Sequence, residues 1–238
     1  MSLPRLRLEN CTFDGKIWTI DVEQSHHLVK VRRCYTGSLV EGLLSGERIK
    51  LKLLCYGNSV FAEEISRKTE APIKPHLHLL LALLKNEQFD DALRFSAEIG
   101  VHTIHILLCE RSVPKYTTKK TEDKMNRWEK ILEEATKQAG STNPPILNYP
   151  TEITKFNFNL LPKNKYITLI GEEVQKIKGI EIPSELAVAI GPEGDWTHSE
   201  VQLFLENSFI PISLGKRILR ASTAVAVACG TLMLLGKK

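Results

Sequence analysis

The stretch Leu186–Glu200, which reads LAVAIGPEGDWTHSE, decides the fold class. Its first five residues form a continuous apolar run, typical of a strand that a parallel sheet buries on both faces. Gly191 and Pro192 end that strand, and the Thr197-x-x-Glu200 spacing matches a capping box that opens a helix. A buried strand that passes through a short loop into a capped helix predicts an α/β fold.

The chain on both sides of this stretch repeats the alternation of strand and helix. Asn86 and Gly100 have the residue types that cap the start and end of a helix, and Ser222 is expected to open the last helix. We therefore predict a mostly parallel sheet with helices on both faces over residues 74–238. The expected strands are 76–84, 103–109, 166–170, 186–190 and 210–214, and the expected helices are 86–99, 122–139, one after Thr197, and 222–235.

The first 71 residues have a different pattern, with short β-rich segments separated by turn signals such as Asp14-Gly15 and Ser45-Gly46. Pro72 and Pro75 then predict a linker, because proline suits neither a helix interior nor a central strand. We predict a small β-barrel domain of residues 1–71. Its expected strands are 5–8, 17–22, 47–54 and 59–65, with one short helix at 25–32.

Composition excludes several classes of protein. With 42% hydrophobic and 25% charged residues, the 238-residue chain has the balance of a globular protein, so disorder is not expected. Its apolar stretches are too short to cross a bilayer and no signal-peptide core is seen, so we expect a cytoplasmic protein without a membrane partner. Five widely spaced cysteines without a CxxC pair predict buried thiols, with neither disulfides nor a bound metal. A net charge of +4 permits nucleic-acid binding without demanding it.

Ligands of open α/β sheets bind beyond the carboxyl ends of the strands, and three loops qualify there: 171–173, 191–194 and 215–220. The Gly-Pro-Glu-Gly loop can present backbone groups to an adenine or a ribose, but a plain strand-to-helix turn explains it equally well. The third loop carries Lys216, Arg217 and Arg220, which indicate either phosphate or RNA contact or simply surface charge. Arg220 precedes a helix N-terminus, where the dipole disfavours a cation by about 0.3–1 kcal/mol unless an anion is nearby, which favours function.

No dinucleotide-binding, P-loop, zinc-protease or serine-hydrolase motif is present. The ordered set of longer segments instead resembles the RsmE-type small-subunit rRNA uridine-N3 methyltransferases of the SPOUT class. These segments are HHLVKVRR at 26–33, AEIGV at 97–101, ERSV at 110–113, Arg127-Trp128, IGPEG at 190–194 and LGKRILR at 214–220.

The resemblance implies an RNA-binding PUA-like barrel, a trefoil-knotted SPOUT domain, S-adenosyl-L-methionine as cofactor, a homodimer, and 16S rRNA or the small ribosomal subunit as substrate. It carries the RNA-binding role to Lys30, Arg32, Arg33 and Arg111. The cofactor-binding residues that it implies are Leu169, Ile170, Gly171, Glu172, Ile190, Gly191, Pro192, Gly194, Leu214, Gly215, Ile218 and Leu219.

Two residues are candidates for catalysis. Uracil N3 carries a proton, and a cation beside O2 or O4 stabilises the anion left when that proton is removed. Arg220 is our candidate for this cation, and Glu193 is the nearest carboxylate, which either removes the proton or only orients its loop. His26 and His27 are expected to be surface residues, and Trp196 either stacks on a ligand or covers the core.

The chain departs from the family pattern at polar positions. Ala221-Ser222 replaces a usual Thr-Glu, Ser141 lies near the site of a usual arginine, Gln88 replaces a lysine, and Asp195 replaces a glycine. Three alternatives therefore stay open. The protein is a catalytically weakened RNA-binding member of the fold, a SPOUT methyltransferase that acts on another RNA position, or a small-molecule α/β enzyme with a nucleotide cofactor.

Overall fold

The structure is a computed structural model that describes residues 3–57, 59–112, 118–170, 175–176 and 182–236. The chain divides into two compact units. The first contains residues 1–72 together with 136–143, and the second contains residues 73–135 and 144–238. The segment 136–143 thus groups with a part of the chain that lies more than sixty residues earlier in the sequence.

The first unit contains a six-stranded sheet in the order β1-β4-β5-β6-β3-β2. All pairs are antiparallel except β1 with β4, which are parallel. One α-helical turn, α1 (Val22–His26), continues directly into a π-helix (His27–Val31) where the sequence predicted one short helix. The strands are β1 (Arg5–Arg7), β2 (Thr12–Phe13), β3 (Ile17–Thr19), β4 (Leu39–Leu44), β5 (Glu47–Tyr56) and β6 (Ser59–Thr69).

Alternation along β5 shows how this sheet buries one face. Ile49, Leu51 and Leu53 are fully buried in the core of the unit, whereas Lys50 and Lys52 point away and are exposed. Burying three large aliphatic side chains contributes on the order of 5–9 kcal/mol before the entropy cost of folding.

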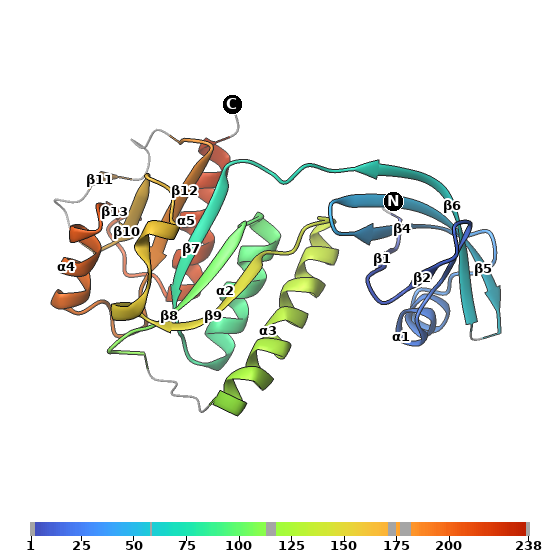
Figure 1. Ribbon diagram of the computed structural model, residues 1–238, viewed down its shortest axis with the longest axis horizontal. Coiled ribbons are helices and arrows are strands. Elements are labelled where there is room, and N and C mark those ends of the chain that lie inside the picture. The colour runs from blue at the N-terminus through green and yellow to red at the C-terminus, as the bar shows by residue number, and fades with distance from the viewer. Residues whose placement is uncertain (1–2, 58, 113–117, 171–174, 177–181, 237–238) are drawn as a thin grey trace. The chain divides into compact units, whose positions relative to one another are not determined.

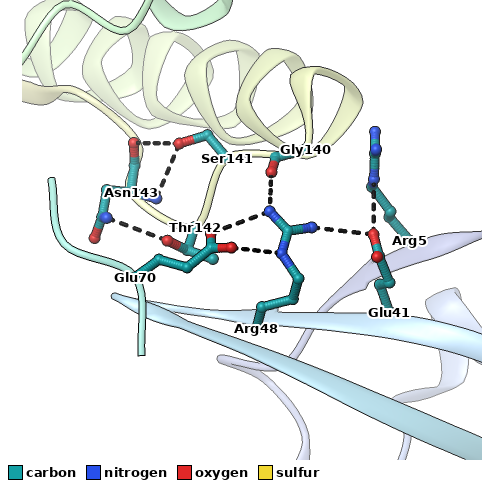
Figure 2. A network of polar contacts seen from close by, with 8 residues as sticks. All are labelled: Arg5, Glu41, Arg48, Glu70, Gly140, Ser141, Thr142 and Asn143. Carbon is teal, nitrogen blue, oxygen red and sulfur yellow. Dashed lines mark hydrogen bonds and ion pairs between the residues drawn. The ribbon is translucent and has the colours of Figure 1, made fainter. Parts of the chain in front are cut away.

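A polar network anchors the segment 136–143 within the first unit (Figure 2). The Arg48 guanidinium donates to both carboxylate oxygens of Glu70, at 2.7 and 3.0 Å, and to Glu41 at 3.0 Å. It also donates to the carbonyl oxygen of Gly140, while Arg5 donates to that of Gln138. Since helix C-termini leave carbonyl groups unpaired, two arginines cap the end of the helix that finishes here.

The second unit contains a seven-stranded sheet in the order β11-β13-β10-β12-β7-β8-β9, in which every pairing is parallel. This confirms the predicted α/β class with a parallel sheet. The strands are β7 (His76–Ala82), β8 (Thr103–Leu108), β9 (Ile146–Glu152), β10 (Lys165–Thr168), β11 (Gln175–Lys176), β12 (Glu185–Ile190) and β13 (Phe209–Ser213).

Helices cover both faces of this sheet (Figure 1). On one face α2 (Asn86–Ile99), α3 (Thr118–Ala139, whose last turn groups with the first unit) and α5 (Ala221–Leu235) pack on Leu77, Leu79 and Leu81. On the other face α4 (His198–Glu206) and two 3-10 turns, Ile153–Lys155 and Phe158–Leu160, pack on Leu80 and Ala82. Alternate residues of β7 therefore supply two separate cores.

Several local expectations were wrong. The N-cap of α2 is Lys85, not Asn86, and α5 begins at Ala221 with Arg220 as its N-cap. The strands β4 and β9 were not predicted. Cys109 and Cys229 are buried, and burial raises the pKa of each thiol to about 12, but Cys11, Cys34 and Cys55 are only half-buried.

Among the described residues, no helix has the length and apolar character needed to cross a membrane.

Candidate functional site

A cavity of about 550 Å³ lies at the carboxyl ends of β10, β12 and β13 in the second unit. Because these strands are neighbours in the sheet, the loops that follow them meet at one edge, and the first turn of α2 closes the cavity. The lining residues are Gln88, Thr168, Leu169, Ile170, Ile190, Gly191, Pro192, Glu193, Gly194, Asp195, Leu214, Gly215, Arg217, Ile218, Leu219, Arg220, Ala221 and Ala224.

The cavity brings together most of the residues that the sequence singled out. Ten of the twelve predicted cofactor-binding residues line it, and so do both catalytic candidates, Arg220 and Glu193. The other two, Gly171 and Glu172, lie outside the described residues. The roles of all these residues stay predictions, since proximity alone assigns no role.

Trp196 packs against the backbone of the Gly-Pro-Glu-Gly loop. Its indole is only 5% exposed and meets Phe204 edge-on, with ring centroids 4.8 Å apart. A Cβ placed on Gly191 would lie 3.1 Å from the Trp196 ring, a contact tighter than usual, so glycine lets the backbone lie close against the indole. Trp196 therefore belongs to the core, which settles the choice that the sequence left open.

Two side chains tie this loop to the turn that follows β8. Arg111 donates from Nη1 to the carbonyl oxygens of Gly194, at 2.8 Å, and of Trp196, at 3.4 Å. The Glu200 carboxylate is 4% exposed and accepts from the backbone N–H groups of Thr197 and Glu110, both at 2.8 Å. The predicted capping box is thus confirmed, and its glutamate also holds the turn that carries Arg111.

Glu193 uses one oxygen to hold a second element of the cavity. Its Oε1 accepts from the backbone N–H of Lys85 at 3.0 Å, and Lys85 is the N-cap of α2. Residues 83–85 join β7 to α2, and Asn86, the first residue of α2, has φ +22°. Glu193 therefore links the loop after β12 to the start of α2, which supports the loop-orienting role among the two that the sequence allowed.

The third loop presents cations beside the cavity. Lys216, Arg217 and Arg220 are all exposed, and Gly215 has φ +129°, a conformation that favours glycine. Arg220 is the N-cap of α5, and its side chain makes no capping hydrogen bond to the described backbone. Arg220 thus puts a cationic residue at a helix N-terminus, where the dipole favours an anion.

The sequence did not mark three of the polar lining residues as ligand contacts. The Thr168 hydroxyl donates to the carbonyl oxygen of Ala189 at 3.0 Å, which joins β10 to β12. Gln88 keeps its Oε1 buried without a hydrogen-bond partner among the described residues, although a buried acceptor is costly to leave unpaired. Asp195 has φ +60°, where the family usually has glycine, and its carboxylate accepts from the Trp196 N–H at 2.8 Å.

The predicted RNA-binding residues fall into two groups. Lys30, Arg32 and Arg33 are exposed on the first unit, within and just after the π-helix, while Arg111 is bound to the loop at the cavity. His26 and His27 are exposed, as expected. Among the described residues, no group of three or more His, Cys, Asp or Glu side chains is arranged to hold a metal ion.

Comparison with known proteins identifies the family. Residues 70–233 match the RNA methyltransferase domain family. The chain is 30% identical to the ribosomal RNA small subunit methyltransferase E of Synechocystis sp., over 88% of this chain and 70% of that protein. It is 29% identical to ribosomal RNA small subunit methyltransferase E 2 of Borreliella burgdorferi, over 91% of this chain and 90% of that protein.

Solved structures agree over the whole length. A Legionella pneumophila protein in complex with the bound cofactor SAM superposes with a TM-score of 0.88 at 26% identity, covering 98% of both chains. Ribosomal RNA small subunit methyltransferase E from Neisseria gonorrhoeae, bound to S-adenosyl methionine, gives 0.86 at 26% identity, again over 98% of both chains. With its own loops gathered around one cavity, the chain belongs to the RsmE family of ribosomal RNA small subunit methyltransferases.

Proposed function

We propose that this protein transfers a methyl group from S-adenosyl-L-methionine to N3 of a uridine in 16S rRNA. The observation that carries the proposal is the cavity at the tips of three neighbouring strands, whose lining includes the exposed residues Arg217 and Arg220. Cations at a cavity suit a polyanionic substrate, because phosphates supply much of the affinity of nucleic acids for proteins.

The residues present fit the cofactor. The volume of about 550 Å³ lies in the usual range for small-molecule sites. Ile190, Leu214 and Leu219 provide apolar walls for an adenine, and the loops around Gly191 and Gly215 provide backbone donors and acceptors. The unpaired Oε1 of Gln88 offers an acceptor to an amino or hydroxyl group. When bound, the cofactor supplies an electrophilic methyl group on a sulfonium.

Arg220 acts on the uracil. Removal of the N3 proton leaves negative charge on O2 and O4, and a guanidinium held beside those oxygens lowers the free energy of that anion. Arg220 suits this role because it lines the cavity and its side chain makes no capping hydrogen bond to the helix that it precedes. Holding the uridine against the loop at Gly191–Gly194 adds the benefit of orientation.

Glu193 is assigned to positioning, with proton removal as the alternative. Glu193→Gln keeps an amide oxygen for the Lys85 N–H but cannot take a proton. If methyl transfer at saturating substrate keeps its rate in this variant, Glu193 only positions the loop. A drop of about a hundredfold or more with unchanged cofactor affinity would make it the base.

The first unit is proposed to be the PUA-like, RNA-binding domain, with Lys30, Arg32 and Arg33 facing phosphates. In the second unit we propose the trefoil knot of the SPOUT class. After β13 the chain returns to α5, which packs on α2 and contacts β12 and β7. The segment 214–220 lines the same cavity as Thr168–Ile170, and this proximity supports the proposed knot.

We further propose a cytoplasmic homodimer. Helix α5 contains no charged residue and is apolar on all sides, yet Val227 and Leu234 are exposed. A helix of this kind is normally buried all round, so a second copy is the occupant that completes its burial. Sedimentation should give a dimer for the parent protein and a monomer for Leu234→Glu, and a monomeric parent would contradict this.

Calorimetry with S-adenosyl-L-methionine and transfer of labelled methyl to small subunits test the function together. Binding and transfer, with N3-methyluridine as the product nucleoside, support the proposal. Cofactor binding without methyl transfer would favour a catalytically weakened RNA-binding protein. Gln88, Ala221 and Ser222, which depart from the family pattern, are the reason for considering this alternative. A different methylated nucleoside would favour another RNA position. An absence of salt-dependent RNA affinity would favour a small-molecule enzyme.

A further inference from the structure

An exposed aromatic surface, defined by Tyr35, Tyr56 and Phe61, lies on the first unit away from its core. Tyr35 is 73% exposed and Tyr56 is 68% exposed. The Tyr56 and Phe61 rings meet edge-on, with centroids 6.0 Å apart and an interplanar angle of 66°. Single exposed apolar residues are ordinary, but an exposed aromatic pair with a third exposed aromatic residue in the same region of the unit calls for an explanation.

Hydrogen bonds of Thr36 bring Tyr35 to the same end of the sheet as Tyr56. The chain turns at Tyr35–Ser38, where the Ser38 N–H donates to the Tyr35 carbonyl oxygen at 2.9 Å, just before β4 begins to pair with β5. The Thr36 hydroxyl accepts from the Cys55 N–H at 2.9 Å and donates to the Cys55 carbonyl at 3.3 Å. Because Thr36 and Cys55 are in contact, the residues next to them in the chain, Tyr35 and Tyr56, lie in the same region of the first unit.

Alternation along the hairpin places these residues outward. Leu53 and Val60 face the core, whereas Tyr56 is exposed and Phe61 is half-buried opposite Leu54. The strands β5 and β6 are labelled in Figure 1. The aromatic surface is therefore part of the solvent face of the sheet and contributes little to the core.

Cations lie beside the aromatic surface. Arg32 and Arg33 are exposed and precede Tyr35 by three and two residues, and Arg33 has φ +55°, which turns the chain from the π-helix toward Tyr35. Lys52 is exposed on the same outward face of β5, opposite Glu63 of β6, the acid nearest to it in the register. Rings with guanidinium groups at their border match the π-faces and phosphates of a single-stranded nucleic acid.

We infer that the aromatic surface binds unpaired bases of the RNA substrate, with one base stacked on Tyr35 and one on Tyr56, while Arg32 and Arg33 contact the intervening phosphates. The inference rests on the proposed function for the identity of the partner as RNA. Unpaired bases are the fitting ligand because side chains stack on splayed bases and not on bases inside a duplex. Each stacked base is expected to contribute about tenfold in affinity.

Fluorescence anisotropy with a labelled RNA of about ten uridines tests the inference at one fixed salt concentration. Tyr35→Ala and Tyr56→Ala should each weaken binding about tenfold, while Tyr35→Phe and Tyr56→Phe should bind as the parent does. Tyr149→Ala is the matched control, because Tyr149 is 62% exposed on β9 of the other unit. An abasic strand of equal length and charge should bind the parent more weakly and should not distinguish the variants.

Equal RNA affinity for the parent and both alanine variants, or equal affinity of the abasic strand, would overturn the inference and would make this surface a protein contact or a bare surface. Methyl transfer by the parent is measured in parallel. Transfer by the parent with unaltered RNA binding by the variants would remove the stacking site and leave the proposed function standing. Loss of RNA binding in the variants without any methyl transfer by the parent would contradict the proposed function and would leave the stacking site supported.

Discussion

Arg111 reaches from the turn after β8 to the loop after β12, where its Nη1 lies 2.8 Å from the carbonyl oxygen of Gly194. A Cβ on Gly194 would lie 3.1 Å from the Cβ of Arg111, so the two residues are in close contact along their length. The resemblance gave Arg111 an RNA-binding role, but this contact gives it a second one, which is to fix the backbone that lines the cavity.

Replacing Arg111 should therefore weaken cofactor binding. Arg111→Met keeps the apolar stem and removes the donor, so the carbonyls of Gly194 and Trp196 lose a charged partner and the loop gains freedom. We expect about a tenfold increase in the Kd for S-adenosyl-L-methionine by calorimetry. Arg94→Met is the control, since Arg94 is exposed and pairs with Asp91 on the surface of α2. Unchanged cofactor affinity with a reduced salt slope of RNA binding would return Arg111 to RNA alone.

Arg220 should separate chemistry from cofactor binding. Arg220→Ala is expected to slow methyl transfer at saturating substrate by about a hundredfold or more, because it removes the charge that stabilises the uracil anion. Cofactor affinity should stay nearly constant in the same variant. Lys216→Ala, which removes an exposed cation from the same loop, controls for net charge. If cofactor affinity fell in step with the rate, Arg220 would be a cofactor-binding residue.

Asp195 should show how the chain tolerates a left-handed residue in place of glycine. Asp195→Ala loses the hydrogen bond to the Trp196 N–H and keeps a Cβ at φ +60°. Asp195→Gly loses the bond but relieves the backbone, so it should be about 1 kcal/mol more stable than the alanine variant in chemical unfolding. Asp195→Asn, which keeps both an acceptor and tolerance of this conformation, should match the parent. An alanine variant as stable as the parent would show that neither effect operates.

Histidine packing should make the stability of the second unit depend on pH. Burial, with a smaller contribution from His78, lowers the pKa of His105 to about 4, and its Nε2 lies 3.2 Å from Nδ1 of His78. The pKa values of His78 and His102 are lowered too, chiefly by burial. Because the unfolded chain binds these protons more readily, stability is full above about pH 6.5 and is lost as the pH falls toward 4.

For His105 alone the full loss is about 3 kcal/mol, since each pKa unit corresponds to about 1.4 kcal/mol. Unfolding free energies measured in urea at pH 7 and pH 5 test this. His105→Gln, which cannot gain a proton in this range, should lose less stability between the two pH values than the parent. An equal loss in both proteins would place the pH dependence elsewhere.

The parts of the fold that could be predicted are those in which burial leaves a local pattern. β7, β8 and β12 are largely covered on both faces, so each is rich in apolar residues, and β12 contains the unbroken run Leu186–Ile190. β9 is an edge strand with mixed exposure and a proline at 150, and it shows no such run. In β4, a Cβ on Gly42 would lie 2.5 Å from a methyl group of Leu8, so the glycine leaves room for this side chain. A glycine also weakens the strand pattern in the sequence.

The candidate site divides in the same way. The loops at 191–194 and 215–220 could be predicted, because each follows an apolar strand and begins with a glycine, while the predicted loop 171–173 lies outside the described residues. The partners of Arg111 and Glu193 could not, because Gly194 and Lys85 lie 83 and 108 residues away along the chain. The burial of the Gln88 Oε1 could not be predicted either, because it results from tertiary packing, such as that of α2 against α5, and not from the spacing of neighbouring residues in the sequence.

The arginine network at Gly140 has a consequence for anyone who divides this protein. A cut after Pro72 would separate Arg5 and Arg48 from the carbonyl oxygens of Gln138 and Gly140 that they bind. The amino-terminal fragment would lose part of its own structure, although every strand of its sheet was retained. A graft of this unit onto another protein therefore has to include two stretches of polypeptide, residues 1–72 and 136–143. In a chimera that exchanges only the first stretch, the arginines and the carbonyl groups that they bind would come from different proteins.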